Sequence, residues 1–132
     1  MTHRALLCCP AALTALLQVQ SRGVELLEEL AACAQEVGAS CGVDAGQAAF
    51  VHGDALSDSL ADAGVLMLAS QCWDEALRAR AREKLEAEAP AGLVVVDYVP
   101  SLADSAVFEL AGSTQGEVSW NDRQTFFAYR RR

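Results

Sequence analysis

The sequence lacks the signatures of several common kinds of site. Its five cysteines show no Cys-x-x-Cys spacing and it has only two histidines, so no metal site is predicted. The odd number of cysteines gives no disulfide framework either, which favours a reducing, intracellular compartment. The apolar stretch at residues 5–19 is too short for a membrane span, which takes about 20 residues.

Positive charge is also scarce. Ten Lys and Arg residues stand against 18 Asp and Glu residues, giving a net charge of −8. This balance argues against binding nucleic acid through bulk electrostatics and suits a basic partner better. The run Arg130 to Arg132 is interpreted as a solvated tail.

What the chain does contain is an alternation of predicted helices and strands within one domain of 132 residues. Helical periodicity predicts helices at residues 11–17, 27–37 and 75–88. The apolar face of the second includes Leu30 and Val37, and Asp74 is placed to cap the third. A strand that ends on an acidic residue is predicted at 21–25, and apolar runs predict strands at 48–51, 64–69 and 93–96. The run at 64–69 is expected to be a central strand buried on both faces.

An antiparallel hairpin is predicted at the carboxyl end. An extended stretch, 107–120, is interrupted near Ser113, and 125–129 pairs with it through a connection at 121–123. Trp120 and Tyr129 are interpreted as hairpin packing. The order of all elements predicts parallel β-α units in an open α/β sheet.

Acidic residues follow two successive predicted strands. Ligands of open parallel sheets lie beyond the carboxyl ends of the strands, which directs attention to Glu25, Asp54, the Ser70-Gln71 pair and Asp97. Glu25 can accept hydrogen bonds from both hydroxyls of a ribose, and Asp54 from an adenine amino group. The alternatives are a helix-cap or solvated acid for Glu25 and an ordinary turn aspartate for Asp54. Together the two acids are predicted to bracket an adenosine.

The segments around these acids resemble a known family. Residues 22–30, Arg-Gly-Val-Glu-Leu-Leu-Glu-Glu-Leu, are similar to the second motif of class I S-adenosylmethionine-dependent methyltransferases. Residues 50–56, Phe-Val-His-Gly-Asp-Ala-Leu, are similar to the adenine-binding motif of their Dot1-like, non-SET histone-lysine branch. Further segments resemble that branch's fourth strand with its next helix and its closing hairpin: 62–66 with 72–75, and 118–120 with 127–130.

The resemblance implies an enzyme that uses S-adenosyl-L-methionine to methylate a protein lysine, such as one in a histone, and hence a nuclear location. It implies a cofactor site made of Glu25 at the ribose, Gly53, Asp54 and Ala55 at the adenine, and Ser70 near the methionine part. It implies a catalytic lysine channel formed by Ser70, Gln71 and Trp73. Trp73 has an alternative interpretation as a helix-start residue packed on the core.

The sequence also departs from the family. Ala55 stands where phenylalanine is usual, Ser70 stands where asparagine is usual, and no Gly-x-Gly turn precedes Ala11. Only glycines let backbone amides approach the methionine part of the cofactor closely. We therefore expect residues 1–132 to be a single, partial catalytic domain with a Rossmann-like methyltransferase sheet, incomplete at the amino end. Without a first strand, the sheet would have an unpaired central edge. The alternative function is a non-catalytic remnant that pairs with a partner chain.

Overall fold

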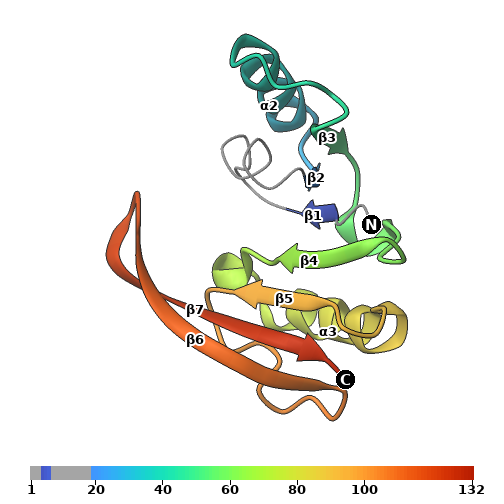
Figure 1. Ribbon diagram of the computed structural model, residues 1–132, viewed down its shortest axis with the longest axis vertical. Helices are drawn as coiled ribbons and strands as arrows, with labels where there is room; N and C mark the ends of the chain where they lie inside the picture. The colour runs from blue at the N-terminus through green and yellow to red at the C-terminus, as the bar shows by residue number, and fades with distance from the viewer. Residues whose placement is uncertain (1–3, 7–18) are drawn as a thin grey trace.

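The computed structural model describes residues 4–6 and 19–132, and their strands form one seven-stranded sheet (Figure 1). The strands are β1 (Arg4–Leu6), β2 (Gln20–Glu25), β3 (Ala48–His52), β4 (Ala63–Met67), β5 (Val94–Asp97), β6 (Phe108–Val118) and β7 (Asn121–Arg131). Their order is β3-β2-β1-β4-β5-β7-β6. The first five are parallel, whereas β7 is antiparallel to β5 and β6. The predicted fold class is confirmed.

Strand β1 corrects one expectation about the amino end. It lies between β2 and β4 and pairs with both, so the centre of the sheet has no unpaired edge. The sequence offered little signal for β1 because the strand has only three residues. The amino end of the chain therefore contributes only this short strand to the described sheet. The predicted helix at 11–17 lies outside the described residues.

Helices α2 (Glu28–Ser40) and α3 (Glu75–Glu88) lie on opposite faces of the sheet. Phe50 contacts α2, since a Cβ placed on Gly38 would lie 3.2 Å from its ring. The register across β3, β2, β1 and β4 puts Phe50 on the same face as Val65, whereas Leu66 packs on the other face with Leu85 of α3. Of the residues described, none form a helix long and apolar enough to cross a membrane.

The core lies between α3 and the strands β4, β5 and β7. Its buried members are Leu60, Ala63, Leu66, Leu85, Ala89, Leu93, Val95, Leu102, Phe108 and Tyr129. Strand β4 is central, as predicted, but it is not buried on both faces, because Val65 is 37% exposed. Helix α2 buries Ala31 and leaves Leu30 and Val37 of its apolar face 53% and 56% exposed.

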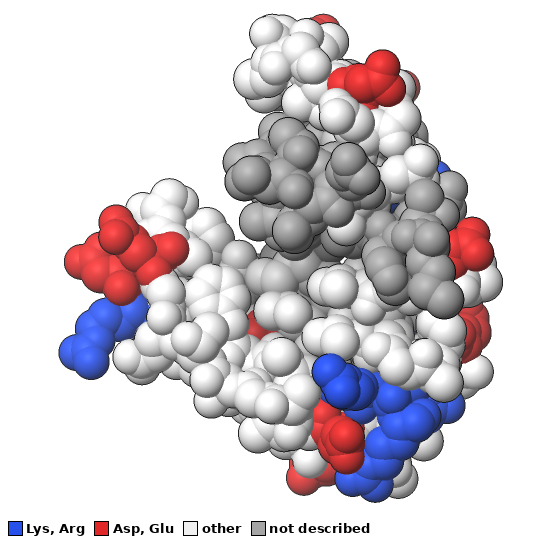
Figure 2. Space-filling model, in the orientation of Figure 1, with Lys and Arg blue, Asp and Glu red and all other residues white. Residues whose placement is uncertain are grey.

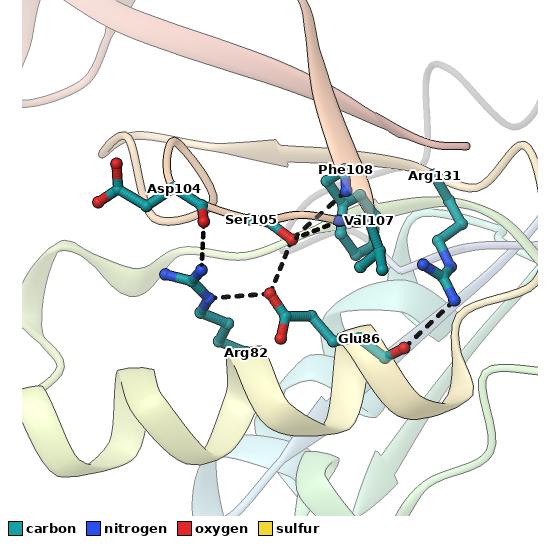
Figure 3. Close-up of polar contacts among 7 residues, drawn as sticks. All are labelled: Arg82, Glu86, Asp104, Ser105, Val107, Phe108 and Arg131. Carbon is teal, nitrogen blue, oxygen red and sulfur yellow. Dashed lines mark hydrogen bonds and ion pairs between the residues drawn. The ribbon is translucent and has the colours of Figure 1, made fainter.

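A polar network attaches the connection between β5 and β6 to α3 (Figure 3). Glu86 Oε1 accepts hydrogen bonds from Arg82 Nε at 2.9 Å and from the Ser105 hydroxyl at 2.7 Å. Arg82 also donates to the carbonyl of Asp104, and Arg131 to the carbonyl of Glu86. The Ser105 oxygen in turn accepts two backbone N–H groups at the start of β6. This network fixes where the terminal hairpin begins.

The hairpin itself differs from its predicted form. Its turn is Ser119-Trp120 and not 121–123, and β6 is continuous through Ser113, with register shifts on either side. Asp97, the last residue of β5, pairs with Phe127. Residues 121–126 of β7 therefore continue past the carboxyl end of β5, over roughly 20 Å at the usual rise of a strand. Figure 1 shows this outer part projecting away from the sheet.

Candidate functional site

The carboxyl ends of β2 and β3 bring two of the predicted site residues onto one rim. The strands are adjacent and parallel, with Glu25 opposite His52. The Gly53 N–H donates to the Glu25 carbonyl oxygen at 2.9 Å, and His52 Nε2 lies 3.1 Å from the Leu26 carbonyl oxygen. These contacts join the turn after β2 to the turn after β3. Glu25 and Asp54 thus lie at neighbouring strand ends, as the sequence predicted.

Each of these acids also has a local structural role. Glu25 Oε1 accepts the Leu27 N–H at 2.9 Å, just before α2. Asp54 Oδ1 accepts the Leu56 N–H at 2.9 Å and caps the short 3-10 helix η1 (Ala55–Ser57). Within the described part of the chain, neither carboxylate has a second hydrogen bond. One oxygen of each is therefore available to accept a hydrogen bond from a ligand.

An apolar cleft opens directly beyond Asp54. It holds about 410 Å³ of empty space, part of it open to solvent, between η1, β4 and α3. Its lining consists of Ala55, Leu56, Asp58, Leu60, Leu66, Leu68, Trp73, Ala81, Lys84 and Leu85. The connection between β3 and β4 contains η1 but no α-helix, and Ala55 is small, which leaves this space unfilled. At the rim, Arg22 donates to both carboxylate oxygens of Asp58, at 2.9 and 2.7 Å.

Glycine at position 53 is not required by the protein's own packing. A Cβ there would lie 3.8 Å from Val24 Cγ1, an ordinary contact, and the backbone is not in the left-handed region. A need for Gly53 would therefore come from the close approach of a ligand. That role stays a prediction.

Ser70 lies at the end of β4, where the short 3-10 helix η2 (Ser70–Cys72) begins, but its hydroxyl is engaged inside the protein. It is 1% exposed and donates to Asp97 Oδ2 at 2.6 Å, while its N–H donates to Asp97 Oδ1 at 3.2 Å. Asp97 is fully buried and also accepts the Tyr98 N–H at 2.8 Å. The pair joins the carboxyl ends of β4 and β5. A ligand contact through the Ser70 hydroxyl would require this bond to break.

The other two residues of the predicted channel follow Ser70. Gln71 is exposed, and Trp73 is half-buried beside the helix start. Trp73 lines both the cleft and a smaller hollow that it shares with Ser70 and Arg78. The packing interpretation and the channel interpretation of Trp73 are therefore compatible.

The role of Asp97 was not predicted. The sequence marked it as an acid at a strand end but gave no reason to pair it with Ser70, which lies 27 positions earlier. The signal that could have found it is an acid that closes an apolar strand in a parallel sheet. Such an acid has backbone N–H groups of the neighbouring strand's turn within reach.

Comparison with solved structures decides the fold. An RNA methyltransferase from Salinibacter ruber in complex with S-adenosyl-L-homocysteine superposes with a TM-score of 0.68 and 16% identity, over 98% of this chain and 79% of that one. The fold is that of class I methyltransferases. A mutant of MtNAS gives a TM-score of 0.74 and 17% identity, over 98% of this chain and 53% of that one. The putative methyltransferase yhhF from Escherichia coli gives 0.68 and 14%, over 98% and 76%.

These similarities concern the fold. The chain spans about half the length of MtNAS, and the three identities lie between 14% and 17%. No known protein family matches the chain, and no curated protein matches it.

Proposed function

We propose that this chain is an S-adenosylmethionine-dependent methyltransferase domain. The observation that carries the proposal is the placement of Glu25 and Asp54 at adjoining strand ends, next to the point where the order reverses between β1 and β4. Open α/β sheets bind their ligands at such a point. The proposal is supported by similar folds solved with S-adenosyl-L-homocysteine and with S-adenosylmethionine.

The residues present fit the adenosine half of this cofactor. The ribose carries two adjacent hydroxyl donors, for which the second carboxylate oxygen of Glu25 is an acceptor. The adenine amino group is a donor that suits Asp54, and the apolar cleft begins at the next residue, Ala55. The segment after β1, residues 7–18, contains no glycine and lies outside the described residues, so the fit concerns the adenosine half.

When bound, S-adenosylmethionine supplies an electrophilic methyl group on its sulfonium. Methyl transfer then asks the protein mainly to hold the acceptor in line and to exclude water. Gln71 and Trp73, which follow β4, would shape the acceptor channel. Asp97 would hold that segment in place through Ser70.

The narrower part of the proposal concerns the acceptor. The Dot1-like resemblance favours a protein lysine, such as one in a histone, and with it a nuclear location. The net charge of −8 suits a basic substrate. RNA is the competing acceptor, because the Salinibacter ruber protein is an RNA methyltransferase. Transfer of labelled methyl groups to histones and to RNA in parallel reactions would decide between them.

Calorimetric titration with S-adenosyl-L-homocysteine tests the cofactor site. Asp54→Asn keeps an acceptor for the Leu56 N–H but presents a donor to the adenine amino group. We expect it to weaken binding by about tenfold, the effect of losing one hydrogen bond to a charged group. The matched control is Asp44→Asn. Asp44 accepts the Gly46 N–H in the turn before β3, at the end of that strand opposite to Asp54. Wild-type protein that gives no heat at millimolar ligand refutes the proposal.

The alternative function is a non-catalytic interaction module. It is favoured by the exposed apolar side chains at the start of α2 and along it: Leu26, Leu27, Leu30 and Val37, which are 53% to 67% exposed. Exposed apolar surface of this kind is typical of a protein contact. Concentration-dependent association in sedimentation, together with no cofactor binding, would favour the module. Cofactor binding by a monomer would exclude it.

A further inference from the structure

The outer half of the terminal hairpin carries an aromatic cluster past the carboxyl edge of the sheet. Tyr98 directly follows Asp97 at the end of β5. Its ring contacts Trp120 edge to face, with centroids 5.8 Å apart, and Phe126 at 5.2 Å. We call Tyr98, Trp120 and Phe126 the hairpin platform. The platform lies one residue from the contact between Ser70 and Asp97, and therefore beside the edge where an acceptor would enter.

Two contacts within the sheet hold the platform in place. Gln124 Nε2 donates to the carbonyl oxygen of Tyr98 at 3.4 Å, which ties β7 to the end of β5. The Phe126 ring lies against Gly116 of β6, where a Cβ would come within 3.2 Å of it. Trp120 is nevertheless 60% exposed at the turn. The interpretation of Trp120 as packing thus accounts for only part of its ring, and the rest faces solvent.

The charges around the platform are mixed. The charged residues of the segment 116–124 are Glu117, Asp122 and Arg123. The register shift between Gly116 and Val118 adds one residue to β7, so Asp122 and Arg123 both lie opposite Glu117, on the side away from Gln124 and Phe126. Figure 2 shows acidic and basic side chains next to one another at the projecting end of the hairpin, and a larger basic patch at the opposite side of this view.

The basic residues lie mostly away from the platform. Of the ten Lys and Arg residues, four are on α3 and three are at the carboxyl end of β7. Helix α3 begins at the carboxyl edge of the sheet and runs away from it, and the end of β7 lies at the amino edge. A cationic ligand at the platform therefore meets little repulsion from them.

We propose that the hairpin platform docks a lysine- or arginine-rich peptide segment. The face of an exposed tryptophan attracts ammonium and guanidinium groups, and the Trp120 ring is largely exposed. The overall charge of −8 attracts a basic peptide and repels a nucleic acid. The role of the platform in docking the methyl acceptor rests on the proposed function. Its ability to bind a basic peptide does not, and it is tested without the cofactor.

The test uses fluorescence anisotropy of a labelled dodecapeptide of alternating lysine and glycine, with the full chain at low salt. Trp120→Ala should weaken binding about threefold to fivefold, as expected for the loss of one exposed cation–π contact. The matched control is Leu110→Ala, a residue of β6 that is similarly exposed, at 58%, and lies away from the platform. Asp122→Asn and Glu117→Gln, which lie together on the side of the hairpin away from Phe126, should each have a smaller effect than Trp120→Ala.

Two further probes decide the chemistry of the ligand. A dodecapeptide of alternating glutamate and glycine and an oligouridine of twelve nucleotides should both bind at least tenfold more weakly than the lysine peptide. Equal or tighter binding of oligouridine overturns the proposal in favour of nucleic acid. Equal binding of Trp120→Ala and wild type overturns the assignment to the platform. Titration of the same variants with S-adenosyl-L-homocysteine shows whether the cofactor site is intact, so failure of the proposed function is seen separately.

Discussion

Removing the buried carboxylate of Asp97 should destabilise the whole domain. Asp97 is fully buried and accepts three hydrogen bonds: two from Ser70 and one from the Tyr98 N–H. Asp97→Ala leaves all three donors without this acceptor in a site that has no access to water. Because these donors come from the segments after β4 and β5, the change also loosens the edge that we assign to the ligand.

The magnitude follows from the number of donors left. A buried polar group without a partner costs about 1–3 kcal/mol. Three such groups, one of which is a hydroxyl that can rotate toward another acceptor, give a loss of about 3–5 kcal/mol in the free energy of unfolding. Ser70→Ala removes one donor and leaves the carboxylate with two N–H partners, so it should cost about 1–2 kcal/mol.

Urea unfolding, followed by tryptophan fluorescence, measures these losses as shifts of the midpoint at constant slope. Combining the two changes should cost less than their sum by about 1 kcal/mol, because they remove one shared interaction. An Asp97→Ala protein within about 0.5 kcal/mol of wild type, the range of an ordinary surface substitution, would refute the reasoning. So would strict additivity in the double variant.

Three more predictions concern pH and surface packing. Burial, with nearby carboxylates, raises the pKa of Tyr129 above its ordinary value. The tyrosine of the unfolded chain ionises above about pH 10, so the free energy of unfolding should fall as the pH rises beyond that value. Thermal unfolding of Tyr129→Phe should not show this dependence. The hydrogen bond from the Ser105 hydroxyl, and then Arg82, lower the pKa of Glu86. The stabilising effect of the Glu86 carboxylate should therefore disappear as the pH falls through that lowered pKa. The urea midpoints at about pH 3 and pH 6 should differ less in Ser105→Ala than in wild type. Leu30→Gln, on the exposed face of α2, should change the free energy of unfolding by less than about 0.5 kcal/mol, whereas Leu93→Ala in the core should cost about 2–5 kcal/mol by the same assay.

The sequence carried enough information for the parallel half of the sheet. Strands β3, β4 and β5 have apolar runs of the right length, and Asp74 caps α3 as predicted, accepting the Leu77 N–H at 2.7 Å. A three-residue strand such as β1 leaves no periodic pattern, because its position is fixed by pairing with strands on both sides. The hairpin turn was misplaced because 121–123 contains polar residues typical of turns, whereas the actual turn holds Trp120.

The candidate site was predictable in part for the same reason. Glu25 and Asp54 lie at the ends of strands, and those ends can be located from the sequence pattern. The direction of the Ser70 side chain depends on Asp97, which is distant in sequence and adjacent only in the folded sheet. The exposure of Leu30 and Val37 was also beyond the sequence, since a helical pattern defines an apolar face without saying what covers it.

The pairing of β5 with β7 also sets the order in which the molecule can be completed during synthesis. Val95 at the centre of the core pairs with Tyr129, which the ribosome adds to the chain 34 positions later (129 minus 95). Until that segment has left the ribosome, Val95 and Leu93 have no antiparallel partner. The nascent chain then exposes the edge of β5 as an open template, which is the stage at which a chaperone or a second nascent copy would meet it.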